Sequence, residues 1–249
     1  MIPLSAIIIT LNEEKNIGRC IESVKNVADE IIVVDSFSTD RTKEICTSHG
    51  IRFIQNEWKG YSAQKNFAQD LASHNFIISL DADEALSNEL SESISAVKNL
   101  DVIQIYSFNR LTNYCGKWIR HGGWYPDIKT RMYDRRKSKW EGSIHERLLF
   151  PDGEKVTLLK GDCHHYTFYT VEEHRKQVEK FTTLMAEEEF SKGRQASWLR
   201  VVFGPVVKFI RDYIIRGGFI DGKEGFLISR ISAYATFLKY SKLRKKRLH

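Results

Sequence analysis

Three carboxylates gather directly after one apolar run of the sequence. Asp81, Asp83 and Glu84 follow residues 76–80 (FIISL), a run typical of a buried strand. Ligand sites of open parallel sheets lie beyond the carboxyl ends of such strands. Carboxylates this close repel one another unless a cation lies among them, and Mg²⁺ or Mn²⁺ accepts such ligands and can bridge to a diphosphate. An acidic turn that caps the next helix is the alternative, because an Asp-x-Asp triplet alone is a weak signal.

The sequence lacks the other common phosphate-binding motifs. It has no G-x-G-x-x-G after a strand and no G-x-x-x-x-G-K-[ST]. The main sequence evidence for a dehydrogenase or a P-loop enzyme is therefore absent. A nucleotide site in this chain would have to be built from strand ends and a metal ion.

Short apolar runs alternate with helical patterns in the N-terminal part. The expected strands are residues 4–10, 30–34, 51–55 and 76–80, and the expected helices are residues 14–27, 41–48 and 62–72. This alternation predicts an α/β fold with a Rossmann-like, mostly parallel sheet flanked by helices. Further on we expect strands at 102–108 and 129–133, a Gly- and aromatic-rich binding loop at 114–127, and a helix at 171–192.

The C-terminal tail carries an excess of positive charge. Residues 192–249 hold 14 of the 38 Lys and Arg residues but 3 of the 32 Asp and Glu residues. Two apolar, basic stretches, 198–215 and 226–243, are too interrupted by charge to span a bilayer. Their pattern favours amphipathic helices at an anionic membrane surface, with ordinary packing helices as the alternative.

Compartment and partner class follow from the remaining composition. The four cysteines form no CxxC pair, which indicates reduced thiols in a cytoplasmic protein, and residues 1–10 are typical of a core strand and not of a signal peptide. The pI near 9.0 also allows a non-catalytic nucleic-acid-binding protein. No RRM, KH or zinc-finger pattern supports that hypothesis, so no nucleic acid is expected as a partner.

Three N-terminal segments together resemble glycosyltransferase family 2, which has the GT-A fold. They are residues 7–14 (IIITLNEE), 32–40 (IVVDSFSTD) and 81–84 (DADE). Residues 140–146 (WEGSIHE), 164–166 (HHY) and 217–222 (GGFIDG) are similar to the subgroup of bacterial lipopolysaccharide-core β-1,4-glucosyltransferases. The resemblance implies an inverting, metal-dependent enzyme that uses a nucleotide-sugar donor. It also implies a division of the chain into residues 1–100 (nucleotide-sugar binding), 101–192 (acceptor binding and catalysis) and 193–249 (basic amphipathic helical tail).

The same resemblance assigns donor contacts one position at a time. The nucleotide-sugar-binding positions are Thr10, Leu11, Glu13, Asp35, Lys65, Asp81 and Arg131. Among them, Asp35 would hydrogen-bond the uracil base, while Ser36 stands where many relatives have a second Asp. Lys65 would serve the base or the phosphates, with a solvated helix lysine as the alternative, and Arg131 would contact the diphosphate. Asp81 would face the ribose and the metal.

Metal, base and acceptor positions follow in the same way. Asp83 would ligate Mg²⁺ or Mn²⁺ directly, and His165 would approach the metal or the diphosphate. A structural histidine is the alternative, and the spacing of Cys163, His164 and His165 does not predict zinc. The predicted aromatic contacts to the acceptor sugar are Trp124 and Tyr125, which could instead anchor their loop.

An inverting enzyme also needs a general base for the acceptor hydroxyl. The resemblance favours Glu146, with Glu141 and Asp127 as rivals. The structural alternative is that Glu146 is a surface carboxylate that pairs with Arg147.

These expectations combine into one functional hypothesis. The enzyme would move a hexose, glucose from UDP-glucose, to a lipopolysaccharide inner-core or other lipid-linked saccharide acceptor. It would act in the cytoplasm, peripheral to the inner face of the cytoplasmic membrane. Transfer to polyprenyl phosphate or to a peptide is the nearest alternative, and a degenerate fold that binds a nucleotide sugar without turnover is another.

Overall fold

The computed structural model describes residues 1–100, 102–142 and 146–246, and the chain forms two compact units. The first unit comprises Met1–Arg110 and Asp127–His165, and the second comprises Leu111–Pro126 and Tyr166–His249. Residues 143–145 of the WEGSIHE motif, and Arg247 in the basic tail, lie outside the described residues.

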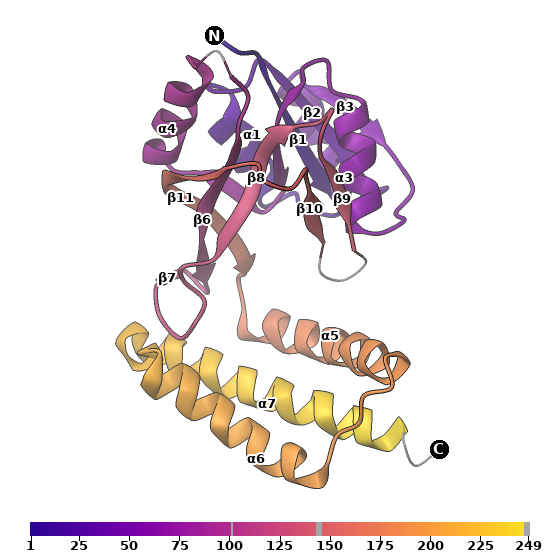
Figure 1. Ribbon diagram of the computed structural model, residues 1–249, viewed down its shortest axis with the longest axis vertical. Helices are drawn as coiled ribbons and strands as arrows, with labels where there is room; N and C mark the ends of the chain where they lie inside the picture. The colour runs from indigo at the N-terminus through magenta and orange to yellow at the C-terminus, as the bar shows by residue number, and fades with distance from the viewer. Residues whose placement is uncertain (101, 143–145, 247–249) are drawn as a thin grey trace. The chain divides into compact units, whose positions relative to one another are not determined.

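The main sheet is mixed, with strand order β3-β2-β1-β4-β8-β6-β11-β5 and β7 paired to β6 (Figure 1). Its parallel strands are β1 (Leu4–Thr10), β2 (Glu30–Asp35), β3 (Arg52–Gln55) and β4 (Phe76–Asp81). The later strands are β5 (Glu84–Leu86), β6 (Ile105–Tyr114), β7 (Lys117–Ile119), β8 (Ile128–Asp134) and β11 (Val156–Phe168). Among these, β8 is antiparallel to β4 and β6, β7 to β6, and β5 to β11. A separate two-stranded ribbon joins β9 (Lys139–Glu141) and β10 (Arg147–Leu149).

Helices cover both faces of the parallel strands. They are α1 (Ile17–Val24), α2 (Thr42–Ser48), α3 (Tyr61–Asp70) and α4 (Asn88–Lys98). Successive side chains of β1 point to opposite faces, so Ile8 packs in the cluster that contains α1, while Ile7 and Ile9 pack in the cluster that contains Ala68 of α3. Each fully buried isoleucine contributes about 1.5–3 kcal/mol to folding. The arrangement confirms the predicted GT-A-like fold class.

One glycine fixes the path of β11 past α4. Gly161 has φ +90°, and a Cβ at this position would lie 2.3 Å from the backbone N of Leu90. Next to it, the Ser87 hydroxyl caps α4 by accepting the Leu90 N–H (3.2 Å) and also accepts the Asp162 N–H (3.2 Å). Strand β11, which the sequence pattern did not indicate, is therefore held against the start of α4.

The second unit is mainly helical. It contains α5 (Val171–Ser191), α6 (Trp198–Phe209), a π-helical segment η1 (Ile210–Ile215), a 3₁₀ segment η2 (Gly218–Asp221) and α7 (Gly222–Lys246). Helix α7 lies beside both α5 and α6 (Figure 1). Within the described residues, none of the helices has the length and apolar character needed to cross a membrane.

A buried carboxylate ties the β7 loop to the helices of this unit. Asp221 is 6% exposed and accepts the backbone N–H groups of Arg120 (3.1 Å) and His121 (2.8 Å). The Lys117 ammonium donates to the Asp221 carbonyl (2.6 Å). The GGFIDG segment therefore holds the loop at residues 117–121 in place.

Candidate functional site

Three of the predicted donor residues meet at the carboxyl edge of the parallel strands. The register of the sheet pairs Thr10 of β1 with Asp35 of β2, and Ile9 of β1 with Asp81 of β4. Thr10, Asp35 and Asp81 therefore lie on adjacent strands at one edge. This is the edge at which open α/β sheets bind ligands.

Lys65 is a buried cation between two predicted functional carboxylates. Its side chain is fully buried, and its Nζ lies 3.1 Å from Oδ1 of Asp81 and 3.0 Å from Oε1 of Glu146. Both contacts are ion pairs, and the Lys65 ammonium also donates a hydrogen bond to Glu146. Nζ also lies 4.8 Å from the ring centroid of Trp140. The solvated lysine is excluded because this side chain is fully buried, while the role of Lys65 in donor binding stays a prediction.

Hydrogen bonds join helix α3 to strand β9 and Gly142. The Asn66 amide donates to the Trp140 carbonyl (2.9 Å) and accepts the Trp140 N–H (2.9 Å). The Ser62 hydroxyl donates to the carbonyl of Gly142 (2.6 Å). These bonds hold strand β9 and Gly142 against the helix that carries Lys65.

Arg131 on β8 is the second buried cation of the edge. Its Nη2 donates to Oδ2 of Asp81 (2.8 Å) and to Oε1 of Glu84 (3.3 Å). Burial would raise the pKa of Asp81, but Lys65 and Arg131 outweigh it and hold that pKa well below its usual range. The Nε and Nη1 atoms of Arg131 are buried and have no partner in the described part of the chain. Two donors are therefore left for a ligand or for water.

Two members of this network had no predicted role. Glu84 is 1% exposed, accepts the Asp81 N–H (3.0 Å) and lies 3.4 Å from Nη1 of Arg110. Arg110 also pairs with Asp127 (2.8 Å). Glu84 was visible as the third carboxylate of the DADE motif, but a single arginine in the interior of a strand gives no sequence signal.

Asp83 and His165 come together from β4–β5 and β11. Strand β11 pairs with β5 so that His165 lies opposite Glu84, and Nε2 of His165 is 3.1 Å from Oδ2 of Asp83. Both side chains keep some exposure, 13% for His165 and 21% for Asp83. Within residues 1–100, 102–142 and 146–246, no group of three or more His, Cys, Asp or Glu side chains could hold a metal ion. A metal here would therefore need ligands from the substrate and water in addition to this pair.

The loop after β1 contributes the other predicted pocket residues. Leu11 is 48% exposed, and the Thr10 hydroxyl oxygen is buried without a hydrogen-bond partner among the described atoms. Glu13 is half-buried and accepts a hydrogen bond from the Asn16 amide (2.7 Å). Burial, with a further contribution from Asp83, raises the pKa of Glu13 from its ordinary value of 4.5 to about 7.

This pKa shift predicts a pH-dependent stability difference for Glu13→Gln. Between pH 4.5 and 7 the folded chain holds a proton on Glu13 that the unfolded chain has lost, so the wild type loses stability as the pH rises through this window. The variant lacks this loss and should gain about 3 kcal/mol relative to wild type from pH 4 to pH 8. Urea unfolding of both proteins in EDTA at several pH values measures this difference in the free energy of unfolding. The exposed Glu57→Gln should show no such trend, and an equal trend in both variants would refute the shift.

Asp35 is fully buried and already partnered. It accepts the Ser38 N–H (2.9 Å), the Ser38 hydroxyl and the Gln55 amide (3.2 Å). A buried glutamine that the sequence did not indicate, Gln64, donates to the Ser36 hydroxyl (3.1 Å) and links α3 to this loop. Each carboxylate oxygen retains acceptor capacity, so the base-binding role stays a prediction.

The predicted acceptor aromatics lie in the second unit. The Trp124 ring packs edge-to-face against Tyr114 (5.8 Å) and His174 (5.7 Å). Arg120 lies over the Tyr125 ring, 5.4 Å from its centroid. Trp124 therefore anchors an aromatic cluster, whatever else it contacts.

The two rival bases have other partners. Glu141 pairs with Arg147 (3.3 Å), and Asp127 pairs with Arg110 (2.8 Å) and Lys129 (3.0 Å). Glu146 contacts the buried Lys65 and not Arg147 as the surface alternative required. Glu146 stays the predicted base, with its carboxylate held by the buried Lys65.

Comparisons with known proteins identify the family of this chain. A family profile described as glycosyl transferase family 2 matches residues 5–157. A glycosyltransferase of Rickettsia bellii (strain RML369-C) is 34% identical over 254 residues, which cover 97% of this chain and 86% of that protein. The lipopolysaccharide core biosynthesis glycosyltransferase LpsC of Rhizobium meliloti (strain 1021) is 31% identical over 250 residues, covering 97% and 92%.

Among solved structures, glucosyl-3-phosphoglycerate synthase from Mycobacterium tuberculosis with Mn²⁺ and UDP-glucose is 21% identical. It covers 45% of this chain and 44% of that chain, with a TM-score of 0.37. The family match spans more than half of the chain, and the two bacterial relatives match it almost end to end. The chain therefore belongs to glycosyl transferase family 2 and is a glycosyltransferase.

Proposed function

We propose that this glycosyltransferase transfers a hexose, glucose from UDP-glucose, with inversion to a lipopolysaccharide inner-core or other lipid-linked saccharide. The observation that carries the proposal is Lys65, a buried cation held between the donor-edge carboxylate Asp81 and the candidate base Glu146. This contact links the predicted donor site to the predicted catalytic group. The relative of Rhizobium meliloti, a lipopolysaccharide core biosynthesis enzyme, supports the acceptor class.

The donor would lie along the carboxyl edge of β1, β2 and β4. Asp35 has the acceptor oxygens for a uracil base, and the exposed Leu11 lies in the loop beside it. Arg131 is the proposed contact to the diphosphate, because a guanidinium makes paired hydrogen bonds to phosphate oxygens. Its Nε and Nη1 atoms are buried, so donor binding would have to uncover them.

The residues present fit a divalent cation. Asp83 and His165 converge from two elements, and their oxygen and nitrogen donors are compatible with Mn²⁺ or Mg²⁺. Bound there, the cation would neutralise charge on the leaving diphosphate. Asp81 faces Lys65 and Arg131, so we assign it to orienting the donor and leave direct ligation to Asp83 and His165.

Glu146 would take the proton of the attacking acceptor hydroxyl. Lys65 holds its carboxylate through an ion pair of 3.0 Å. A fixed carboxylate is what general-base catalysis requires. Trp124 and Tyr125 are the proposed contacts to the acceptor sugar, and the basic helices of the second unit would hold the enzyme at an anionic membrane surface, at the inner face of the cytoplasmic membrane.

A transfer assay tests this proposal. With Mn²⁺, UDP-glucose and purified lipopolysaccharide-core acceptor, wild type should form a β-linked glucoside, and Glu146→Gln should lower kcat about 10²–10⁴-fold, the range for a lost general base. The anomeric proton signal in NMR reports the stereochemistry. Glu141→Gln is the matched control and should keep near wild-type kcat. An α-linked product would contradict inversion, and full activity of Glu146→Gln would contradict its role.

A further inference from the structure

A groove lies between the antiparallel pair α6 and α7 of the second unit. Its volume is about 850 Å³. Helix α5 adds two residues to the wall, and the α6–η1 and α7 walls are basic and apolar. The lining residues are Thr182, Met185, Leu199, Arg200, Phe203, Gly204, Val207, Lys208, Arg211, Ser232, Ala235, Thr236, Lys239 and Tyr240. We call this the α6–α7 groove.

Four cations and no carboxylate line the groove. Two of them are held by the buried Asp212, which lies 2.7 Å from Lys208 and 3.0 Å from Arg211. The other two, Arg200 and Lys239, have no carboxylate partner in the described part of the chain, and Nζ of Lys239 lies over the Tyr240 ring at 4.8 Å. The groove therefore presents uncompensated positive charge.

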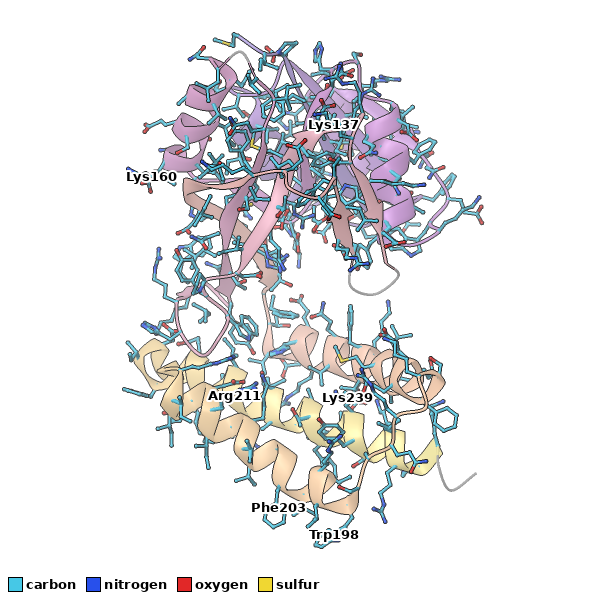
Figure 2. All side chains as sticks on the ribbon, viewed as in Figure 1. Lys137, Lys160, Trp198, Phe203, Arg211 and Lys239 are labelled. Carbon is cyan, nitrogen blue, oxygen red and sulfur yellow. The ribbon has the colours of Figure 1, made fainter. Side chains whose placement is uncertain are left out.

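The α6 wall continues into an unpartnered apolar surface. Half of the exposed large apolar side chains of the described residues lie between residues 198 and 237. On α6 they include Trp198 (57% exposed), Phe203 (55%) and Val207 (63%). Figure 2 shows the Trp198 and Phe203 side chains projecting outward from α6. Exposed apolar surface of this extent marks an interaction site.

Close helix packing sets the floor of the groove. A Cβ at Gly204 would lie 3.2 Å from Cε2 of Tyr240 and 3.4 Å from Cγ2 of Thr236. Glycine lets the two helices approach here, while the larger side chains on either side form the walls. The hollow therefore has an apolar wall from Phe203 and Val207 and cations at its rim.

We propose that the α6–α7 groove binds one anionic phospholipid of the membrane. Its phosphate would lie between Arg200 and Lys239, and an acyl chain would follow the Phe203 and Val207 wall. The proposal rests on the proposed membrane association. It goes further because it assigns a specific lipid-binding site, whereas membrane association alone requires only nonspecific electrostatic attraction. Cations paired with exposed aromatic and aliphatic side chains match an amphiphile with an anionic head.

The charge and apolar pattern favours this occupant over a macromolecule. A nucleic-acid surface would place its cations among polar groups and would not expose Trp198, Phe203 and Val207 to water. An acidic amphipathic peptide is the remaining rival and would bind without a bilayer.

Vesicle flotation of the full-length enzyme tests the groove. Wild type should bind phosphatidylcholine vesicles that contain phosphatidylglycerol and not pure phosphatidylcholine vesicles. The double variant Arg200→Ala/Lys239→Ala should bind at least about tenfold more weakly, as expected for two cations at a membrane surface. The matched control, Lys223→Ala/Arg230→Ala, removes two exposed cations of α7 outside the groove and should lose less than about threefold.

The possible results distinguish a lipid site in the groove from general membrane association and from the proposed enzyme activity. Equal losses in the two double variants would overturn the groove and leave diffuse membrane association standing. Absence of wild-type binding would overturn both, while the transfer assay would still judge the enzyme activity. Circular dichroism and transfer to a soluble acceptor fragment should be unchanged in both variants.

A second arm identifies the ligand. Calorimetry with monomeric dihexanoyl phosphatidylglycerol should show binding that the groove variant loses, and glycerol phosphate should bind far more weakly. Equal affinity for inorganic phosphate would overturn the lipid assignment in favour of a free-phosphate site. If the groove binds an acidic peptide more tightly than the short-chain lipid, the lipid assignment is overturned in favour of a protein partner.

Discussion

Replacing Lys65 with methionine is expected to lower the free energy of unfolding by about 3 kcal/mol and to abolish measurable sugar transfer. The methionine fills the same buried space but leaves Asp81 and Glu146 without their shared cation. Removing one partner of a buried ion pair costs about 3–5 kcal/mol, and the lower end applies because Asp81 and Glu146 keep 23% and 21% of their side chains exposed. For a chain of this size the loss corresponds to a melting temperature lower by about 10 °C.

Lys98→Met separates the structural effect from the catalytic one. Lys98 is also a buried lysine, 6% exposed, and pairs with Asp29 (2.7 Å) away from the donor edge. Its loss should lower the melting temperature too, yet kcat per folded molecule should stay near wild type. Thermal unfolding and the transfer assay at a temperature where each variant is folded measure both effects. Wild-type stability together with wild-type kcat in Lys65→Met would contradict the assigned role.

Asp83→Ala should lower kcat/KM by at least about 10²–10³-fold with little change in stability. The loss follows from the metal, because a Lewis acid at the diphosphate supplies several kcal/mol of transition-state stabilisation. The small change in stability follows from exposure, because Asp83 is 21% exposed and contacts a histidine that is charged only when protonated.

The control for Asp83→Ala is Asp152→Ala, an exposed aspartate outside the site. Asp152→Ala should change neither kcat/KM nor the stability. Transfer rates measured against added Mn²⁺ and melting curves in EDTA give both readouts. A variant at Asp83 that keeps wild-type kcat/KM and the same Mn²⁺ dependence would refute the ligand assignment.

The donor edge could be predicted because its signals are local. The strands β1, β2 and β4 are unbroken apolar runs, and the polar residues that follow them must meet at one edge of a parallel sheet. The buried face of α1 was equally plain from the spacing of Ile17, Cys20, Ile21 and Val24. Helix ends were less accurate: α1 begins at Ile17 and not at residue 14, because residues 13–16 form a turn in which the Asn16 and Ile17 N–H groups both bond to the Glu13 carbonyl.

The network around the edge could not be predicted because its partners are distant in sequence. Lys65 and Glu146 are 81 residues apart, and Arg131 reaches Asp81 across 50 residues. Strand β11 carries mixed polar and apolar residues, so no apolar run in the sequence indicated a strand there. It is nevertheless the element that brings His165 to Asp83. Likewise, no pattern indicated that residues 111–126 pack with the C-terminal helices, a contact made through Asp221.

The second unit shows both the strength and the limit of composition. The basic, apolar tail was evident from residue counts, and its two stretches do form α6 and α7. Composition could not say which cations are neutralised inside the unit. That Asp212 holds Lys208 and Arg211, and leaves Arg200 and Lys239 without carboxylates in the described chain, is visible only in three dimensions.

Calorimetric titration of UDP-glucose into the purified enzyme, with Mn²⁺ and with EDTA, tests the central claim most directly. Wild type should bind the donor in Mn²⁺ and lose at least about tenfold in affinity in EDTA, and Asp83→Ala should bind equally weakly under both conditions. UDP should behave as UDP-glucose does, because in the proposed donor site the diphosphate would contact the metal. Tight donor binding that ignores both EDTA and Asp83→Ala would contradict the metal-assisted donor site. Absence of binding by UDP-glucose and UDP under either condition would contradict the proposed donor itself.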